Sequence, residues 1–451
     1  MDAYSSKQQK VALAGLSNLL AGISYFYGST VQYKEEDGST HTTQKGELIT
    51  AIPGRSYFPR GFLWDEGFHQ LVLLHWNESL SWKILKSWFA RMEPSGYIER
   101  EQILGSEARA RVPSEFVTQD PRVANPPTLL FAFRQLVKRA IEHAKQDVDP
   151  QRTVDVEILA EGEQSAGLEA SIAGLEIQEM FEKVKKWVFY LEKSQKSKLP
   201  SSYRWFGRTE NHCLASGMDD FPRHHILSQS ESNVDLLSWI LFAYQNLAEI
   251  DQMLNGETEF GMGMRQQIEW MKKRLDEHWD EEAKSFGDLG VIRLNENGSE
   301  EIGFEIHRGY VSILPFALML LDVNDPRIEF ILNDIENPEI MWSPFGLRSL
   351  SKSDPYFGKG EDYWRGHIWV NLNYLVLRAL HEKYAVEGPL KERCQSLYER
   401  LRENLVSNII DQFQSSGFFW ENYDSVTGKG SGVHPFTGWT TLFIPIMSEK
   451  Y

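Results

Sequence analysis

The chain contains very little cysteine, with only Cys213 and Cys394 among its 451 residues. Two thiols exclude a disulfide scaffold and a zinc site built from cysteines, because both need more of them. Whether these two cysteines pair with each other is left open by the sequence. The fold must therefore rest on a hydrophobic core, which a chain of this length is long enough to bury.

An excess of positive charge and long apolar runs are also missing. The formal net charge is −17, and nucleic-acid binding needs a basic surface, so we expect no nucleic-acid partner. No segment approaches the roughly 20 apolar residues that span a bilayer. Residues 1–7 lack the pattern of a signal peptide. These absences predict a soluble chain without membrane contact of its own, and its oligomeric state is not encoded in any visible pattern.

Common catalytic and metal-binding motifs are absent too. The sequence has no His-Glu-x-x-His segment, no Gly-x-Ser-x-Gly elbow and no phosphate-binding glycine loop. The histidines at 224, 225 and 307 do not have ligand spacing, so no metal site is predicted. Two Asn-x-Ser sequons, at Asn77 and Asn297, permit a secretory context, although such triplets also arise by chance.

Helical periodicity is what the sequence has in abundance, because apolar residues recur at spacings of three and four. The segments with this pattern are 7–26, 67–92, 127–146, 177–195, 229–253, 262–279, 310–322, 364–383 and 388–413. Strand candidates are few and short, such as 290–294. The alternation of helices with long loops predicts one all-α domain over 1–451, a helical toroid with its loops converging on a pocket. A repeat solenoid is the alternative, but no fixed period supports it.

Residues 144–176 differ from their surroundings. They are acidic, nearly free of aromatic residues and contain only scattered apolar ones. This composition predicts an acidic surface insertion or a mobile loop.

Aromatic residues are plentiful, with 14 Trp, 17 Tyr and 25 Phe. Aromatic rings stack on the apolar faces of sugars, although they also fill cores. In residues 58–69, Phe62 and Trp64 are candidates for stacking on a sugar, and Arg60 and Asp65 for binding its hydroxyls. The alternative for this segment is a helix start with Asp65 as the N-cap.

Two further segments have similar alternatives. Trp364 and Arg365 lie in an aromatic stretch that suggests hydroxyl recognition, or simply a buried helix N-terminus. The interleaved charges of residues 99–111 are typical of a solvated helix face, but they also include candidates for a polar site.

Two carboxylates have the most informative surroundings. Asp219 lies in Ser-Gly-Met-Asp-Asp at 216–220, and Glu421 lies in Phe-Trp-Glu-Asn-Tyr-Asp at 419–424. Burial against rings and a nearby second carboxylate raise a carboxyl pKa, as a general acid needs, while a general base must stay ionised and near water. The pair therefore suggests glycoside hydrolysis, whereas a simple turn is the alternative at 216–220.

Several motifs, in this order, resemble signatures of glycoside hydrolase family 63. They are Phe-Leu-Trp-Asp-Glu-Gly-Phe-His at 62–69, Glu-Arg-Glu-Gln-Ile-Leu-Gly at 99–105, Ser-Gly-Met-Asp-Asp at 216–220 and Tyr-Trp-Arg-Gly-x-Ile-Trp at 363–369. The likeness runs from about Lys7 to the C-terminus. It implies an (α/α)6 toroid and an inverting mechanism, with Asp219 as the general acid and Glu421 as the general base. The substrate-binding residues expected with it are Phe62, Trp64, Asp65, His69, Glu101, Trp364, Arg365 and Trp420.

The resemblance also implies a substrate. We expect removal of the outermost α-1,2-linked glucose from glucosylated high-mannose N-glycans on nascent glycoproteins, in the lumen of the endoplasmic reticulum. No cofactor is expected, because both catalytic groups are side chains. Family members of this type usually carry a membrane anchor and a β-sandwich before the toroid, so the chain resembles an isolated catalytic domain or a fragment.

Other functions stay open. One is a different activity within the same family, the hydrolysis of a small α-glucoside or α-mannoside. A carbohydrate-binding toroid without catalysis and a purely structural helical repeat are the alternatives from other classes.

Overall fold

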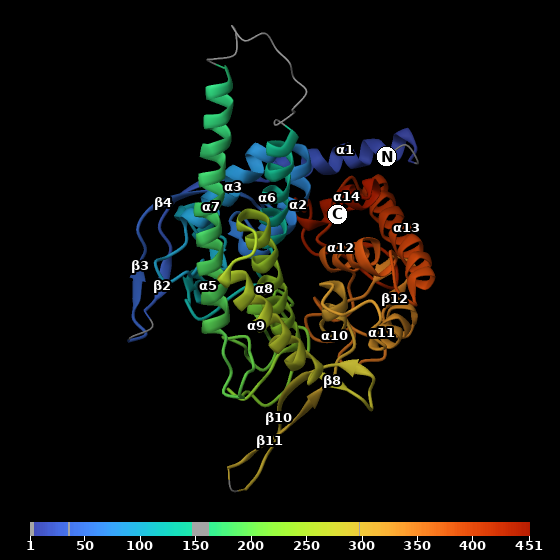
Figure 1. Ribbon diagram of the computed structural model, residues 1–451. Coiled ribbons are helices and arrows are strands. Elements are labelled where there is room, and N and C mark those ends of the chain that lie inside the picture. Colours follow the sequence, from blue (N-terminus) through green and yellow to red (C-terminus); the bar gives the residue numbers. More distant parts are fainter. Residues whose placement is uncertain (1–3, 35–36, 147–161, 297) are drawn as a thin grey trace.

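The computed structural model describes residues 4–34, 37–146, 162–296 and 298–451 (Figure 1). The helices are α1 Ser6–Ala21, α2 Leu63–Trp76, α3 Glu78–Ala90, α4 Gly105–Arg109, α5 Ser114–Val117, α6 Leu129–Gln146, α7 Gly162–Ser194, α8 Val234–Asn255, α9 Glu259–Asp276, α10 Tyr310–Ala317, α11 Arg327–Glu336, α12 Val370–Ala379, α13 Lys391–Ser416 and α14 Phe443–Ser448, with three short turns of helix, η1 Leu214–Ser216, η2 Leu380–Tyr384 and η3 Trp439–Leu442. The strands are β1 Ile23–Gly28, β2 Val31–Tyr33, β3 Thr40–Thr42, β4 Gly46–Ala51, β5 Gly61–Phe62, β6 Glu101–Gln102, β7 Thr118–Gln119, β8 Trp279–Asp280, β9 Ser285–Phe286, β10 Asp288–Leu294, β11 Glu300–Glu305, β12 Trp342–Ser343, β13 Gly346–Leu347, β14 Asn422–Tyr423 and β15 Gly430–Ser431. The predicted predominance of helix over short strands is confirmed for these residues.

Six helical elements contact one another in a closed order. The order is α2, α6, α8, α10, α12 and η3, and η3 returns to α2. Each of the six also contacts a neighbouring helix, namely α3, α7, α9, α11, α13 and α1 in the same order. Every residue of α10 and α12 is buried, as expected for helices that are covered on all sides. The core is therefore built by helices packed between other helices.

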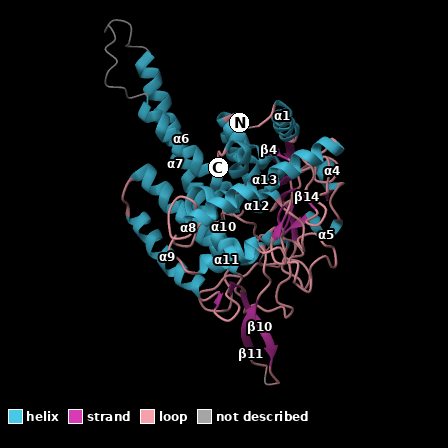
Figure 2. Cartoon of the chain, turned by 90° about the vertical axis from the view of Figure 1, so that its right-hand side faces the viewer, coloured by secondary structure: helices cyan, strands magenta, loops and turns pink. Residues whose placement is uncertain are grey.

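The loops of this assembly gather at one side. In Figure 2, α8, α10 and α12 lie side by side, and the loops collect beyond them, around α5 and β14. The strands of these loops form two-stranded antiparallel pairs and one three-stranded group, β3-β2-β7, in which β2 and β7 are parallel. Since the predicted site residues come mainly from such loops, this side is where a site is expected.

Several predicted helix boundaries were wrong. The segment 67–92 forms two helices, because Asn77 interrupts it and its side chain accepts a hydrogen bond from the Leu80 amide at 2.9 Å, which starts α3. The segment 7–26 ends as a helix at Ala21 and continues as β1, whose sequence, Ile-Ser-Tyr-Phe-Tyr-Gly, is rich in β-branched and aromatic residues. The strand expected at 290–294 lies within β10.

The acidic segment 144–176 is only partly described, because residues 147–161 lie outside the described residues. Its two ends are helical rather than loop: 144–146 belong to α6 and 162–176 to α7. Residues 162–176 include three Ala, three Glu and two Leu, which are residue types that favour a helix.

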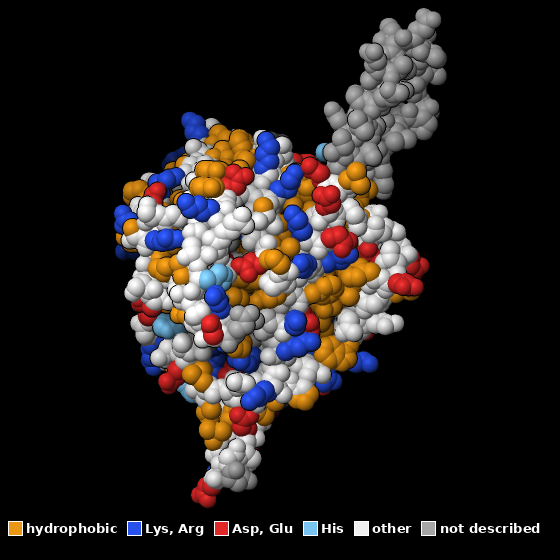
Figure 3. Space-filling model, turned by 90° about the vertical axis from the view of Figure 1, so that its left-hand side faces the viewer, with side chains coloured by type: hydrophobic (Ala, Val, Ile, Leu, Met, Phe, Trp, Pro, Cys, Tyr) orange, Lys and Arg blue, Asp and Glu red, His pale blue; other side chains and the backbone are white. Residues whose placement is uncertain are grey.

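The remaining expectations from composition concern thiols, sequons and charge. Cys213 and Cys394 are both buried and free, and Asn77 is exposed, whereas Asn297 lies outside the described residues. Among the described helices, none has both the length and the apolar character that crossing a bilayer requires. On the face shown in Figure 3, acidic and basic side chains are interspersed and form no continuous basic surface.

Candidate active site

A small cavity of about 80 Å³ lies where the loops converge. Three carboxylic acids line it: Asp65 from α2, Asp219 from the loop after η1, and Glu421 from the residue before β14. Six of the predicted site residues share this cavity, namely Phe62, Trp64, Asp65, Asp219, Trp364 and Glu421. Segments far apart in the sequence therefore build one acidic pocket with aromatic walls.

A larger cavity of about 570 Å³ lies beside the small one. Asp219 and Arg100 line both cavities. Both polar and apolar side chains line the larger cavity, and its lining includes the His212–Glu361 pair, 3.1 Å apart, and the exposed ring of Phe116. Asp219 thus lies at the boundary between a small cavity and a larger one.

The surroundings of Asp219 change its acidity. Desolvation in the enclosed site raises the pKa of this carboxyl to about 8, and the carboxylates of Asp220, Glu101 and Glu421 add to the effect. The Arg100 guanidinium opposes them. A carboxylic acid with this pKa keeps its proton at neutral pH, as a proton donor must.

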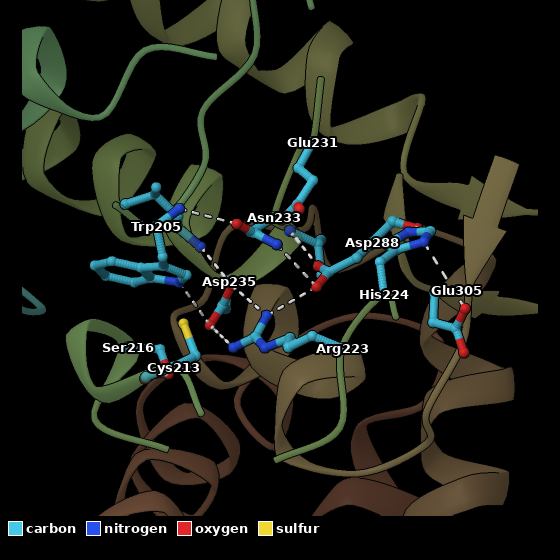
Figure 4. Close-up of polar contacts among 12 residues, drawn as sticks. Trp205, Cys213, Ser216, Arg223, His224, Glu231, Asn233, Asp235, Asp288 and Glu305 are labelled. Atoms are coloured by element: carbon cyan, nitrogen blue, oxygen red, sulfur yellow. Dashed lines mark hydrogen bonds and ion pairs between the residues drawn. The ribbon is translucent and has the colours of Figure 1, made fainter. Parts of the chain in front are cut away.

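The loop that carries Asp219 is anchored by a buried ionic network (Figure 4). Arg223 donates to both oxygens of Asp235, at 3.0 and 2.5 Å, and to Asp288 at 2.9 Å. The indole of Trp205 donates to Asp235 at 3.1 Å. Because Asp235 lies in the first turn of α8 and Asp288 starts β10, both ends of the loop around Asp219 are fixed to regular structure.

Glu421 is 2% exposed and receives two hydrogen bonds. Its Oε2 accepts from the Val433 amide at 3.0 Å, and its Oε1 accepts from the Tyr363 hydroxyl. Burial raises the pKa of Glu421 above its usual value, and both hydrogen bonds limit this rise. These donors stabilise the ionised form, which a general base needs.

Asp65 was predicted as a sugar-binding residue or as a helix N-cap, and the N-cap interpretation is wrong. The N-cap of α2 is Phe62, and Asp65 lies inside the first turn with its side chain on the cavity. Burial and the nearby carboxylates of Glu421 and Asp219 raise the pKa of Asp65 well above its usual range. A neutral Asp65 carboxyl is able to donate a hydrogen bond into the pocket.

Four other predicted residues do not line the small cavity. Glu101 forms buried ion pairs with Arg60, at 2.6 Å, and with Arg100. Arg60 is therefore paired with Glu101 and does not line the small cavity either. Arg365 donates to the backbone oxygen of Asp220 at 2.7 Å.

His69 and Trp420 are the other two. His69 is buried within α2 and lies behind Gly438. The Trp420 ring packs against His434, with ring centroids 3.9 Å apart, and its indole donates to Ser416 at 3.2 Å. Both are therefore part of the packing around the site.

Sequence reasoning missed several residues of the cavity. Arg100 and Tyr363 lie within motifs already singled out, but neither was selected, while Phe58, Phe436 and Trp439 complete the aromatic wall. The available signal was adjacency: Arg100 precedes Glu101 and Tyr363 precedes Trp364. Among the described residues, no group of three His, Cys, Asp or Glu side chains is arranged to hold a metal ion.

Comparison with known proteins identifies the family. The profile described as "Glycosyl hydrolase family 63 C-terminal domain" matches residues 2–449. The chain is 38% identical to a probable mannosyl-oligosaccharide glucosidase of Schizosaccharomyces pombe, over 98% of this chain and 59% of that protein. It is also 38% identical to the mannosyl-oligosaccharide glucosidase of Saccharomyces cerevisiae, over 98% of this chain and 57% of that protein. The chain thus spans less than two thirds of the length of these relatives.

A solved structure supports the fold. The family 63 mannosylglycerate hydrolase of Thermus thermophilus superposes with a TM-score of 0.64 at 15% identity, over 97% of this chain and 99% of that one. At this identity the likeness shows the fold alone. The family profile and the two fungal relatives carry the assignment: the chain belongs to glycoside hydrolase family 63.

Proposed function

We propose that the chain is the catalytic part of an inverting exo-α-glucosidase. Its substrate is a glucosylated high-mannose N-glycan on nascent glycoproteins, from which it removes the terminal α-1,2-linked glucose. The names of the two fungal relatives support this substrate class, and the endoplasmic reticulum lumen is the compartment that goes with it. The observation that carries the proposal is the position of Asp219 between the two cavities.

The two cavities suit cleavage at a chain end. The small cavity is well below the roughly 300–1,000 Å³ of pockets for drug-sized ligands, so we assign no more than one terminal sugar to it. The larger cavity gives room for the remaining oligosaccharide. A glycosidic oxygen between the two would lie next to Asp219, which lines both.

The proposed reaction uses the two carboxyl groups on opposite faces of the sugar. Asp219 gives its proton to the glycosidic oxygen as the bond to the anomeric carbon breaks. Glu421 takes a proton from a water whose oxygen bonds to the same carbon from the other side. Inversion needs room for that water, which corresponds to a carboxyl separation of roughly 6.5–9.5 Å. Trp64 and Trp364 would flank the glucose, and Asp65 and Arg100 would bind its hydroxyls.

The fold supports the same proposal. We assign α2, α6, α8, α10, α12 and η3, which contact one another in a closed order, as the inner ring of an (α/α)6 toroid in one domain, and their neighbouring helices as its outer ring. A toroid of this kind holds its loops at one end, where Figure 2 shows them gathered.

The test is glucose release from a triglucosylated N-glycan, followed by NMR from the first minutes. We expect β-glucose as the first product, because inversion at an α-linkage gives the β-anomer. A small α-glucoside and mannosylglycerate, the compound named for the Thermus enzyme, serve as comparison substrates. Faster turnover of either would favour the small-substrate alternative, early α-glucose would contradict inversion, and binding without turnover would indicate a carbohydrate-binding toroid.

Gly217 provides a prediction about the shape of the pocket. It adopts φ +77°, and a Cβ added there would lie 2.6 Å from the Trp64 ring. We expect Gly217→Ala to displace that ring and to lower kcat/KM by about 10- to 100-fold, since misplacement of about 1 Å at an active site costs this much. The measurement is steady-state kinetics on the triglucosylated glycan.

Gly417 supplies the matched control. Its φ is +79°, but no atom lies within 4 Å of an added Cβ. Gly417→Ala therefore imposes the same backbone strain without touching the pocket, and its kcat/KM should match that of the wild type. Equal losses in both variants would mean that backbone strain, rather than the Trp64 ring, causes the effect.

A further inference from the structure

Asp220, the residue next to Asp219, is 1% exposed and faces a loop 143 residues further along the chain. Its Oδ1 accepts from the Trp364 amide at 2.6 Å, and its Oδ2 accepts from the Tyr363 amide at 3.1 Å. The Arg365 Nε donates to its backbone oxygen at 2.7 Å and lies 3.5 Å from its Oδ2. One buried aspartate thus accepts hydrogen bonds from three consecutive residues of the facing loop.

The same loop reaches the second carboxylate of the pocket. The hydroxyl of Tyr363 donates to Oε1 of Glu421. The backbone oxygen of Tyr363 accepts from the Trp369 indole at 3.1 Å, and the rings of Trp364 and Trp369 stack at 3.8 Å. The Tyr363 side chain is therefore held at its backbone by Asp220 and Trp369, and its far end holds Glu421.

We propose that Asp220 is a positioning residue: through the backbone of Tyr363 and the Tyr363 hydroxyl, it fixes Glu421 relative to Asp219. The inference rests on the proposed function in one respect, namely that these two groups are the base and the acid. The connection is short and continuous. Asp220 is bonded covalently to Asp219, one hydrogen bond joins its carboxylate to the Tyr363 amide, and another joins the Tyr363 hydroxyl to Glu421. Loss of one step displaces the base without removing either reacting carboxyl.

The geometry favours this role over that of an ordinary buried aspartate. Each hydrogen bond recorded at the Asp220 carboxylate comes from the facing loop rather than from its own segment. Residues 363–365 belong to no helix or strand, so backbone ladders do not fix their position. Hydrogen bonds from backbone amides to a buried carboxylate are strong, and loss of the carboxylate leaves these two amides without their charged acceptor.

The test compares Asp220→Asn, Tyr363→Phe and the double variant. Each single change is expected to lower kcat by about 10- to 100-fold, as misplacement of about 1 Å does, and to change KM by less than about threefold. We call the chain of contacts from Asp220 through Tyr363 to Glu421 the relay. If both residues act in this relay, kcat of the double variant falls no further than kcat of the worse single variant, whereas independent effects on kcat multiply.

The pH profile gives a second readout that a merely structural role would not move. Glu421 faces Asp65, Asp219 and Tyr363, and the Tyr363 hydroxyl lowers its pKa. The acidic limb of kcat should therefore move to higher pH in Tyr363→Phe and, by the same amount, in Asp220→Asn. An acidic limb that moves only in Tyr363→Phe would overturn the role of Asp220.

Two additional variants separate positioning from folding. Asp251→Asn is the matched control, because Asp251 is also a buried aspartate and accepts from Asn255 at 2.9 Å outside the cavity. Asp251→Asn should lower stability, while its kcat and the limbs of its pH profile stay those of the wild type.

If Asp220→Asn does not fold, Asp220→Glu replaces it. The charge is kept and the side chain is one methylene longer, so a lower kcat with a displaced acidic limb is still expected. An unchanged kcat in Asp220→Glu would contradict the proposal.

The proposal also has a readout that needs no turnover. The affinity for 1-deoxynojirimycin, a glucose mimic with a basic ring amine, is measured by calorimetry from pH 4 to pH 9. The titration of this amine is the same for every variant, so differences between variants follow the ionisation of the pocket carboxyls. Wild-type binding without glucose release would reject the proposed function and leave the relay testable. Under that outcome, a common pH shift of binding in Asp220→Asn and Tyr363→Phe supports the relay, and unchanged binding in Asp220→Asn overturns it.

Discussion

Asp219→Asn is expected to lower glucose release from the triglucosylated glycan by about 100- to 10,000-fold, the range that general acid catalysis contributes. Asparagine has nearly the same shape but cannot give a proton to the departing sugar oxygen. Because desolvation raises the pKa of Asp219 to about 8, the wild type should lose kcat as pH rises through this value and the donor ionises. Steady-state kinetics across this range measure both effects.

A substrate that needs no proton provides the control. Fluoride leaves α-glucosyl fluoride without protonation, so Asp219→Asn should hydrolyse this compound at a rate within about tenfold of the wild type, while the glycan remains nearly uncleaved. Loss of both activities in a folded variant, with unfolding midpoints unchanged in denaturant, would mean that Asp219 has a different role. Retention of both would place the general acid elsewhere in the pocket.

The helical character and the convergence of loops were predictable from the sequence, since both follow from local patterns. Apolar periodicity predicts long buried helices, and Gly- and aromatic-rich stretches between them predict loops. Helix boundaries were harder to predict from the sequence. Asn77 reads as one polar residue in an apolar pattern, yet its side chain caps α3 and divides the expected helix into two.

For the site, motifs predicted which segments meet but not which side chains face the pocket. Trp64, Asp65 and Trp364 line the cavity as expected, whereas Arg365, one position further, points to the backbone of Asp220. The direction of a loop side chain depends on contacts with segments that are distant in the sequence. Trp420 shows the same limit: next to Glu421 in sequence, it packs on His434 instead.

Partners of the carboxylates were beyond sequence reasoning for a related reason. The Tyr363 hydroxyl and the Val433 amide both reach Glu421 from separate loops, and no spacing in the chain encodes that meeting. These contacts nevertheless favour the ionised form of Glu421. Electrostatics of the site therefore had to come from the three-dimensional arrangement.

Glu421→Gln is the second change with a large expected effect, and it discriminates between the two carboxyl roles. Glutamine keeps the size of the side chain but cannot accept a proton from water, so glucose release should fall by about 100- to 10,000-fold. In contrast with Asp219→Asn, hydrolysis of α-glucosyl fluoride should fall to the same extent, because activation of the water is needed whatever the leaving group. Kinetics with the glycan and the fluoride, side by side, measure this difference.

Asp65 is the rival for the role of base, since it lines the same cavity. Its pKa, however, is raised well above the usual range by burial and by the two neighbouring carboxylates, whereas the Val433 amide and the Tyr363 hydroxyl favour ionised Glu421. Asp65→Asn should therefore weaken binding of the glucose more than it slows hydrolysis of the fluoride at saturation. The opposite result, in which Asp65→Asn abolishes fluoride hydrolysis and Glu421→Gln retains it, would mean that Asp65 is the base. Glu421, held by the Tyr363 hydroxyl, would then be a sugar-binding group.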